Sequence, residues 1–150
     1  MPISEQQIAT LTGVLPPVKV LAIDNNKEEL VDLKNGFEAA GIPCASLLYD
    51  TFDGIIKNNY VNTSQARFVF MDLNLEDVEA NDVARIVPHL ITAIKQLSIS
   101  GPYILIFWTK HPTEVEKVMR RLKTRVSSEF NLPYFFCTMD KIHFKLPDEN

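Results

Sequence analysis

The sequence predicts an α/β fold, a doubly wound sheet of five parallel strands with helices on both faces. Three observations predict it. Short apolar runs such as "VKVLAID" and "RFVFMD" recur along the chain, and runs of this length are typical of strands buried on both faces. Segments with apolar residues at helical spacing lie between these runs. The chain has 150 residues and is 46% hydrophobic, which suits one domain with its own core.

The first half of the chain predicts strands at residues 18–24, 43–49 and 67–72. After the first strand, Asn26 is expected to cap a helix with Glu29 as its capping-box partner, and Gly41 is expected to end it. Leu30, Leu33 and Phe37 give this helix its apolar stripe. The segment 51–60, "TFDGIIKNNY", predicts a weak helix that Gly54 damages.

The second half predicts a long connection at 73–101, then strands at 102–108 and 133–144 with a helix at 113–130 between them. Helical spacing in the connection joins Val83, Val87, Leu90, Ile94 and Leu97. Pro88 predicts a kink or a new helix start there. Thr113 and Glu116 form a candidate capping box for the helix at 113–130. Its predicted buried face is Val115, Val118, Met119, Leu122 and Val126.

Composition narrows the class of protein. The net charge of -4 and the pI of about 5.3 argue against direct nucleic-acid binding by this domain. Cys44 and Cys137 form no CxxC pair and are expected to be buried thiols in a reducing compartment. The run at 103–108 is too short to span a bilayer, and no signal peptide is evident. We therefore expect a cytoplasmic location, without membrane contact.

Polar side chains stand where the predicted strands end, and the carboxyl ends of parallel strands meet at one edge of a sheet. They are Asp24, Asn25 and Asn26 after the first strand, Asp72 and Asn74 after the third, Thr109 and Lys110 after the fourth, and Asp140 and Lys141 after the fifth. Two carboxylates with nearby amide or carbonyl oxygens suit Mg²⁺. A hydroxyl and an ammonium suit an anion such as a phosphoryl group.

These residues resemble the site of the receiver domains of two-component response regulators, and the similarity covers about Val18 to Phe144. The resemblance implies a flavodoxin-like receiver fold over residues 18–150, which is expected to lack the last helix of that fold. Residues 1–17 are then an N-terminal extension, and the chain is a candidate front part of a longer protein. By position, Asp72 matches the phosphoacceptor, Asp24 the first acid, Thr109 the hydroxyl and Lys141 the lysine. Asn25 and the backbone carbonyl of Asn74 complete the implied Mg²⁺ ligands.

The resemblance implies a bacterial phosphorelay function rather than an enzyme. Asp72 would take a phosphoryl group from a histidine kinase or phosphotransfer protein, with Mg²⁺ as cofactor. Thr109 and Lys141 would hold the phosphoryl group. The signal would pass through the surface of the fourth strand, the following helix and the fifth strand to an output domain or partner protein.

Departures from the family pattern keep a second interpretation open. Asn25 replaces the second acid, and Lys110 replaces the small residue that usually follows the hydroxyl. The alternative is a degenerate pseudo-receiver, a protein-interaction module that works without phosphorylation. A phosphatase with an aspartyl nucleophile is a remote third interpretation, because that chemistry needs an acid where Asn74 stands.

The predicted helix at 113–130 is strongly basic in an acidic protein. Five basic residues lie within it: Lys117, Arg120, Arg121, Lys123 and Arg125. One interpretation is a solvated helix face. The other is a docking surface for an acidic partner or for a second copy of the chain.

Overall fold

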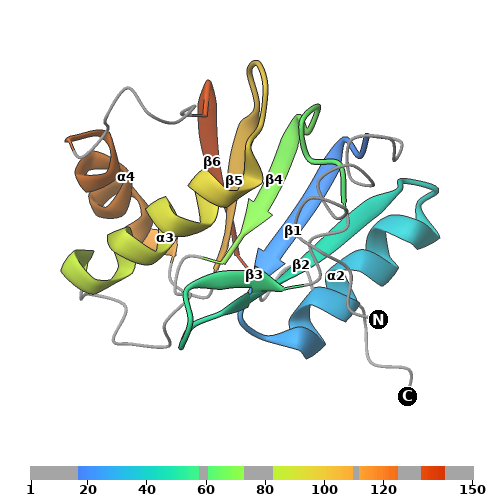
Figure 1. Cartoon of the computed structure of the whole chain (residues 1–150), viewed down its shortest axis with the longest axis horizontal. Coiled ribbons are helices and arrows are strands. Elements are labelled where there is room, and N and C mark those ends of the chain that lie inside the picture. The colour runs from blue at the N-terminus through green and yellow to red at the C-terminus, as the bar shows by residue number, and fades with distance from the viewer. Residues whose placement is uncertain (1–16, 58–60, 73–82, 110–111, 125–132, 141–150) are drawn as a thin grey trace, which may run out of the picture.

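The computed structural model of the protein describes residues 17–57, 61–72, 83–109, 112–124 and 133–140. The elements in chain order are β1 (Val20–Asp24), α2 (Lys27–Ala39), β2 (Cys44–Asp50), β3 (Ile55–Lys57), β4 (Phe68–Met71), α3 (Val83–Leu97), β5 (Ile104–Thr109), the 3-10 helix η1 (Pro112–Glu114), α4 (Val115–Thr124) and β6 (Phe135–Asp140). This alternation confirms the predicted α/β class (Figure 1). Residues 1–16 of the predicted N-terminal extension lie outside the described residues.

The described strands form one six-stranded sheet in the order β3-β2-β1-β4-β5-β6. Five of them, β2, β1, β4, β5 and β6, run parallel, and β3 pairs antiparallel with β2. The chain moves outward from β1 to β2 and then returns to β4 on the other side of β1. In open parallel sheets, ligands bind at such a reversal of strand order, beyond the carboxyl ends of the strands.

The inner strands are buried on both faces because their alternate residues join different core clusters. Leu21 and Ile23 of β1 belong to a cluster with the apolar residues of α3 and α4, whereas Val20 and Ala22 belong to one with α2. In Figure 1, α3 and α4 lie together on one side of the picture and α2 lies on the other, along β1 and β2. Each fully buried aliphatic side chain contributes roughly 1.5–3 kcal/mol, so packing on both faces holds the sheet.

The predicted N-cap residue of α2 and the glycine predicted to end it are both confirmed. The Asn26 side chain accepts hydrogen bonds from the backbone N–H groups of Glu28 and Glu29, which is the N-cap arrangement. At the other end, Gly41 has a φ of +76°, and its N–H donates to the Glu38 carbonyl. The Ile42 N–H donates to the Phe37 carbonyl, which completes a Schellman motif. The ends of α2 are therefore determined by residues close to them in the sequence.

The helix predicted at 51–60 was wrong. Residues 51–54 form a turn, and β3 follows as the sixth strand, so the five-strand count was also too low. The Asp50 carboxylate accepts from the N–H groups of Phe52 and Asp53, at 2.9 and 3.2 Å. Gly54 adopts a φ of +66°, a backbone conformation that favours glycine. A side-chain cap, a left-handed glycine and two adjacent β-branched isoleucines favour a hairpin over a helix.

Helices α3 and α4 differ from expectation, α3 at Pro88 and α4 at its first residue. α3 is one helix from Val83 to Leu97 with Pro88 inside it, so no new helix begins at Pro88. Pro88 lies in the second turn, where its missing N–H removes only one backbone hydrogen bond. Thr113 lies in η1 and not at the N-cap of α4, which begins at Val115, because the fixed φ of Pro112 suits a tight first turn. Four predicted residues of α4 are buried: Val115, Val118, Met119 and Leu122. Val126 lies outside the described residues.

Candidate functional site

Three of the predicted site residues, Asp24, Asp72 and Thr109, stand at the carboxyl ends of three adjacent parallel strands. β1 ends at Asp24, Asp72 directly follows β4, and β5 ends at Thr109. All three are among the few buried polar side chains of the described residues. Burial of a polar group costs free energy unless the group is hydrogen-bonded. Polar residues in surface turns are usually exposed, so the burial of these three side chains is unusual.

Asp24 has no exposed surface. Its carboxylate accepts a hydrogen bond from the Asn26 N–H at 3.0 Å. The side chain therefore helps to turn the chain from β1 into α2, whatever else it does. Asn25, between these two residues, is half-buried.

Asp72 is 7% exposed. Its N–H donates to the Ile23 carbonyl at 3.0 Å, which extends the β1–β4 ladder by one hydrogen bond beyond the strand. The last paired residues of this ladder are Ile23 and Met71, so Asp24 and Asp72 stand at the same level. The predicted meeting of the two aspartates is thus reproduced at the level of the backbone.

The β5–β6 register adds a residue that the sequence reasoning had placed at the strand end without giving it a role. Thr109 of β5 pairs directly with Asp140 of β6. Thr109 is 1% exposed, whereas Asp140 is half-buried. The described part of the edge therefore carries a third carboxylate beside the hydroxyl, where the receiver resemblance calls for an ammonium group. The lengths of β5 and β6 suggest that Thr109 and Asp140 lie side by side, but only the register of the two strands establishes it.

Three predicted or discussed residues lie outside the described residues: Asn74, Lys110 and Lys141. Their predicted roles therefore stay predictions.

The donor set present suits a hard divalent cation. The carboxylates of Asp24 and Asp72 and the amide oxygen of Asn25 are oxygen ligands of the type that Mg²⁺ takes, together with several waters. Within the described ranges, no three His, Cys, Asp or Glu side chains form a group that could hold a metal. A magnesium site here would therefore use two carboxylates with amide, carbonyl and water oxygens.

The predicted basic residues lie on the solvent side of α4. Lys117 is 3.5 Å from the Glu114 carboxylate, and Arg120 is 3.5 Å from that of Glu116. Glu114 is half-buried, whereas both side chains of the Arg120–Glu116 pair are exposed, and an exposed pair contributes only about 0–1 kcal/mol. Arg121 is also exposed. The surface is accessible to a partner.

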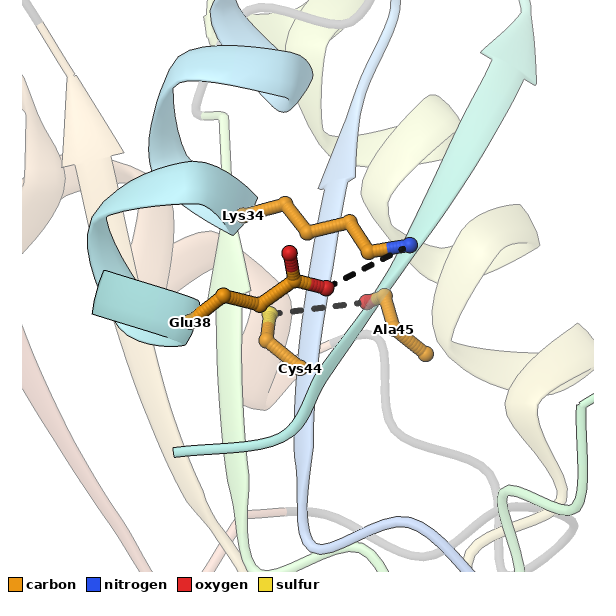
Figure 2. A network of polar contacts seen from close by, with 4 residues as sticks. All are labelled: Lys34, Glu38, Cys44 and Ala45. Atoms are coloured by element: carbon orange, nitrogen blue, oxygen red, sulfur yellow. Dashed lines mark hydrogen bonds and ion pairs between the residues drawn. The ribbon is translucent and has the colours of Figure 1, made fainter. Parts of the chain in front are cut away.

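The two cysteines are poor candidates for chemistry. Figure 2 shows Cys44 at the start of β2, with its thiol 3.8 Å from the Ala45 carbonyl and below the exposed Lys34–Glu38 pair. Burial raises the pKa of the Cys44 thiol to about 11, while Lys34 lowers it and Glu38 raises it by smaller amounts. Burial also raises the pKa of Cys137. Both cysteines are free thiols, as predicted, but only Cys44 is buried as expected, and Cys137 is half-buried.

Comparisons of the chain with protein family models, with curated proteins and with solved structures found no match. The resemblance to receiver domains therefore rests on the strand-end residues described above. Among the helices of the described residues, none is long and apolar enough to cross a membrane.

Proposed function

We propose that this chain is a receiver-like signalling domain that accepts a phosphoryl group on Asp72. The observation that carries the proposal is the position of two buried aspartates, Asp24 and Asp72, at one level on adjacent inner strands. The parallel part of the sheet, in the order β2-β1-β4-β5-β6, is that of flavodoxin-like folds, which supports the proposal. Burial of two carboxylates at the reversal of strand order costs free energy, and such arrangements cluster at functional sites.

The proposed step is a displacement at phosphorus. A carboxylate oxygen of Asp72 attacks the phosphorus of a phosphohistidine or of a small acyl phosphate. The new O–P bond forms as the bond to the leaving group breaks, and that electron pair stays with the imidazole nitrogen or the carboxylate that departs. Water then protonates the released imidazole. The product is an acyl phosphate on Asp72.

The other site residues would support this step. Asp24, Asn25 and Asp72 would hold Mg²⁺, which supplies positive charge against the phosphoryl oxygens. The Thr109 hydroxyl would donate a hydrogen bond to a phosphoryl oxygen. Because Thr109 ends β5 and pairs with β6, a shift of its side chain would alter the surface of β5, α4 and β6, where Lys117, Arg120 and Arg121 would meet an output partner.

The degenerate receiver is a second candidate, because one observation favours it. Asp140 pairs with Thr109 at the β5–β6 edge, and a carboxylate there repels a phosphoryl group. Asn25 also lowers the negative charge available for a metal. Under this hypothesis, the domain binds a partner through the same β5–α4–β6 surface without phosphorylation.

Incubation with Mg²⁺ and acetyl phosphate separates the two candidates. Intact-mass spectrometry should show the mass of one added phosphoryl group on the wild-type chain and none on Asp72→Asn. The matched control is Asp32→Asn, which changes an exposed aspartate on α2 and should be phosphorylated like the wild type. A wild-type chain that gains no phosphoryl group and binds no Mg²⁺ would favour the degenerate module. Steady release of phosphate from phosphate esters would instead favour the phosphatase.

A further inference from the structure

The turn between β2 and β3 exposes an apolar side chain almost completely. Phe52 is 96% exposed and Ile55, at the start of β3, is 53% exposed. Exposed aromatic side chains of this kind are enriched as anchors of protein interfaces. We refer to Asp50, Phe52, Asp53 and Ile55 together as the hairpin tip.

The hairpin tip is held firmly, although it is a loop. The Asp50 carboxylate accepts two backbone hydrogen bonds within the turn, and the Asp50 carbonyl accepts a third from Gly54 at 2.8 Å. Binding through a pre-ordered segment loses less conformational entropy than binding through a flexible loop. The turn that exposes Phe52 is thus held in one conformation by its own hydrogen bonds.

Helix α3 braces the same hairpin from the side. The Gln96 side chain accepts from the Ile56 N–H and donates to the Gly54 carbonyl, both at 2.8 Å. The Tyr49 hydroxyl and the His89 ring form a further link at 2.5 Å. Since Gln96 occupies backbone groups of the edge strand β3, it hinders the addition of another strand there. A partner of the hairpin tip is therefore expected to bind through side chains.

A surface of complementary chemistry lies at the other edge of the sheet. The Lys123 ammonium lies 5.3 Å from the centre of the Phe136 ring, within the range of a cation–π contact. Tyr134, two residues earlier, is 84% exposed. Arg120 lies one turn before Lys123 on α4, and its side chain is 75% exposed. We refer to Arg120, Lys123, Tyr134 and Phe136 as the basic–aromatic patch.

The two surfaces match in charge and in apolar character. The hairpin tip offers an aromatic ring, Phe52, between two aspartates, and a branched aliphatic side chain, Ile55, two residues after the second aspartate. The patch combines the exposed Tyr134 ring, the exposed Arg120 side chain, and the Lys123 ammonium that lies over the half-buried Phe136 ring. Opposite charges across an interface steer association and fix its register, while buried aromatic rings supply affinity.

One chain cannot bring these surfaces together. β3 and β6 are the opposite edges of the described sheet, five strand spacings or about 24 Å apart. The hairpin tip follows the carboxyl end of β2, whereas Tyr134 precedes the amino end of β6. In Figure 1 the hairpin therefore lies at one end of the strands and the start of β6 at the other. Only two molecules can satisfy both surfaces.

We propose that copies of this chain associate head to tail, with the hairpin tip of one copy bound to the basic–aromatic patch of the next. The contact is heterologous, because each copy uses a different surface, so it leaves one free surface of each kind on a pair and allows a chain of copies to grow. It does not depend on a phosphoryl group at Asp72. It shares Arg120 with the surface proposed to meet an output partner, whereas Lys117 and Arg121 belong to that surface alone.

Sedimentation velocity of the full chain over a concentration series tests the proposal. The average mass of the wild type should rise with concentration, and added salt should reduce it. Phe52→Ala and Lys123→Glu should each weaken association about tenfold or more, the size of effect expected for an interface anchor. The matched control is Val31→Ala, which trims another exposed apolar side chain, on α2, and should associate like the wild type. Equal thermal unfolding of all variants would show that folding is unchanged.

Mixing the two defective variants provides the decisive measurement. Phe52→Ala keeps an intact patch and Lys123→Glu keeps an intact hairpin tip. Their equimolar mixture should therefore form a dimer and stop there. A monomeric wild type at every concentration, a mixture that stays monomeric, or a Val31→Ala variant as defective as Phe52→Ala would each overturn the proposal.

Discussion

The inner strands and the outer strand β6 present their polar groups to the candidate site under different physical conditions. Every residue of β1 is buried, and so are five of the six residues of β5, whereas β6 has no buried residue. Asp24 and Thr109 therefore lie where an unsatisfied polar group is costly. Asp140 lies at the same edge but partly in water. Substitution of the site residues on β1 and β5 should therefore lower the stability of the fold, whereas substitution of Asp140 on β6 should change it little.

The largest expected effect compares one aromatic residue from each region. Phe107 of β5 is fully buried, and Phe135 of β6 is 58% exposed. Phe107→Ala should lower the free energy of unfolding by about 3–5 kcal/mol, because it removes transfer free energy and leaves a cavity. Phe135→Ala should change it by less than about 1 kcal/mol. Chemical denaturation of both variants measures the difference.

Equal losses from the two variants would contradict the contrast between inner and outer strands. Such a result would mean that β6 is packed as tightly as β5 in solution. Near-neutral effects from both would contradict the central position of β5 in the sheet.

The part of the fold that sequence reasoning predicted well rests on local signals. Asn26 caps α2 because its side chain reaches the N–H groups of the next turn, and Gly41 ends the helix because it accepts a positive φ. Apolar runs identified the parallel strands because strands buried on both faces have few polar residues. The strand order then placed Asp24 beside Asp72, as expected from the doubly wound pattern.

The parts that were missed depend on non-local or weak signals. In "TFDGIIKNNY", the choice of a hairpin depends on the Asp50 side chain before the segment and on Gln96 of α3. Neither contact is visible in the composition of the segment. The pairing of Thr109 with Asp140 depends on the register of two strands separated by a helix, which a strand-end residue count does not determine.

The two cysteines provide a second comparison between a buried strand and β6. Cys44 is buried on β2, and Cys137 is half-buried on β6. With a pKa raised to about 11 by burial, Cys44 should carry roughly 300-fold less thiolate near neutral pH than an ordinary thiol of pKa ~8.5. Alkylation followed by mass spectrometry should therefore label Cys137 first in the native protein and Cys44 slowly.

The raised pKa of Cys44 also has a stability consequence. The fold favours the protonated thiol, so this contribution is fully present below the unfolded-state pKa of ~8.5. It is lost as the pH rises through the folded-state value of about 11. Cys44→Ser, whose hydroxyl does not titrate in this range, should show less loss of stability between these pH values. Labelling of Cys44 as fast as that of Cys137 would contradict the burial of its thiol.

The smallest expected effect concerns Asp140 and bears most directly on the proposed function. Asp140 is two strands from Asp72 in the sheet, about 10 Å away at the usual strand spacing. A unit charge at that distance in water interacts by only ~0.4 kcal/mol, about a factor of two in an equilibrium. If Asp72 is phosphorylated, Asp140→Asn should therefore raise the affinity for beryllofluoride, a phosphoryl mimic, by about twofold, with Glu116→Gln as a control on α4. A loss of affinity would instead mean that the Asp140 carboxylate positions Thr109 at the site, and an increase well above tenfold would mean that its charge acts through a less polar medium than water. The result would thus show whether β6 merely tunes the site or forms part of it.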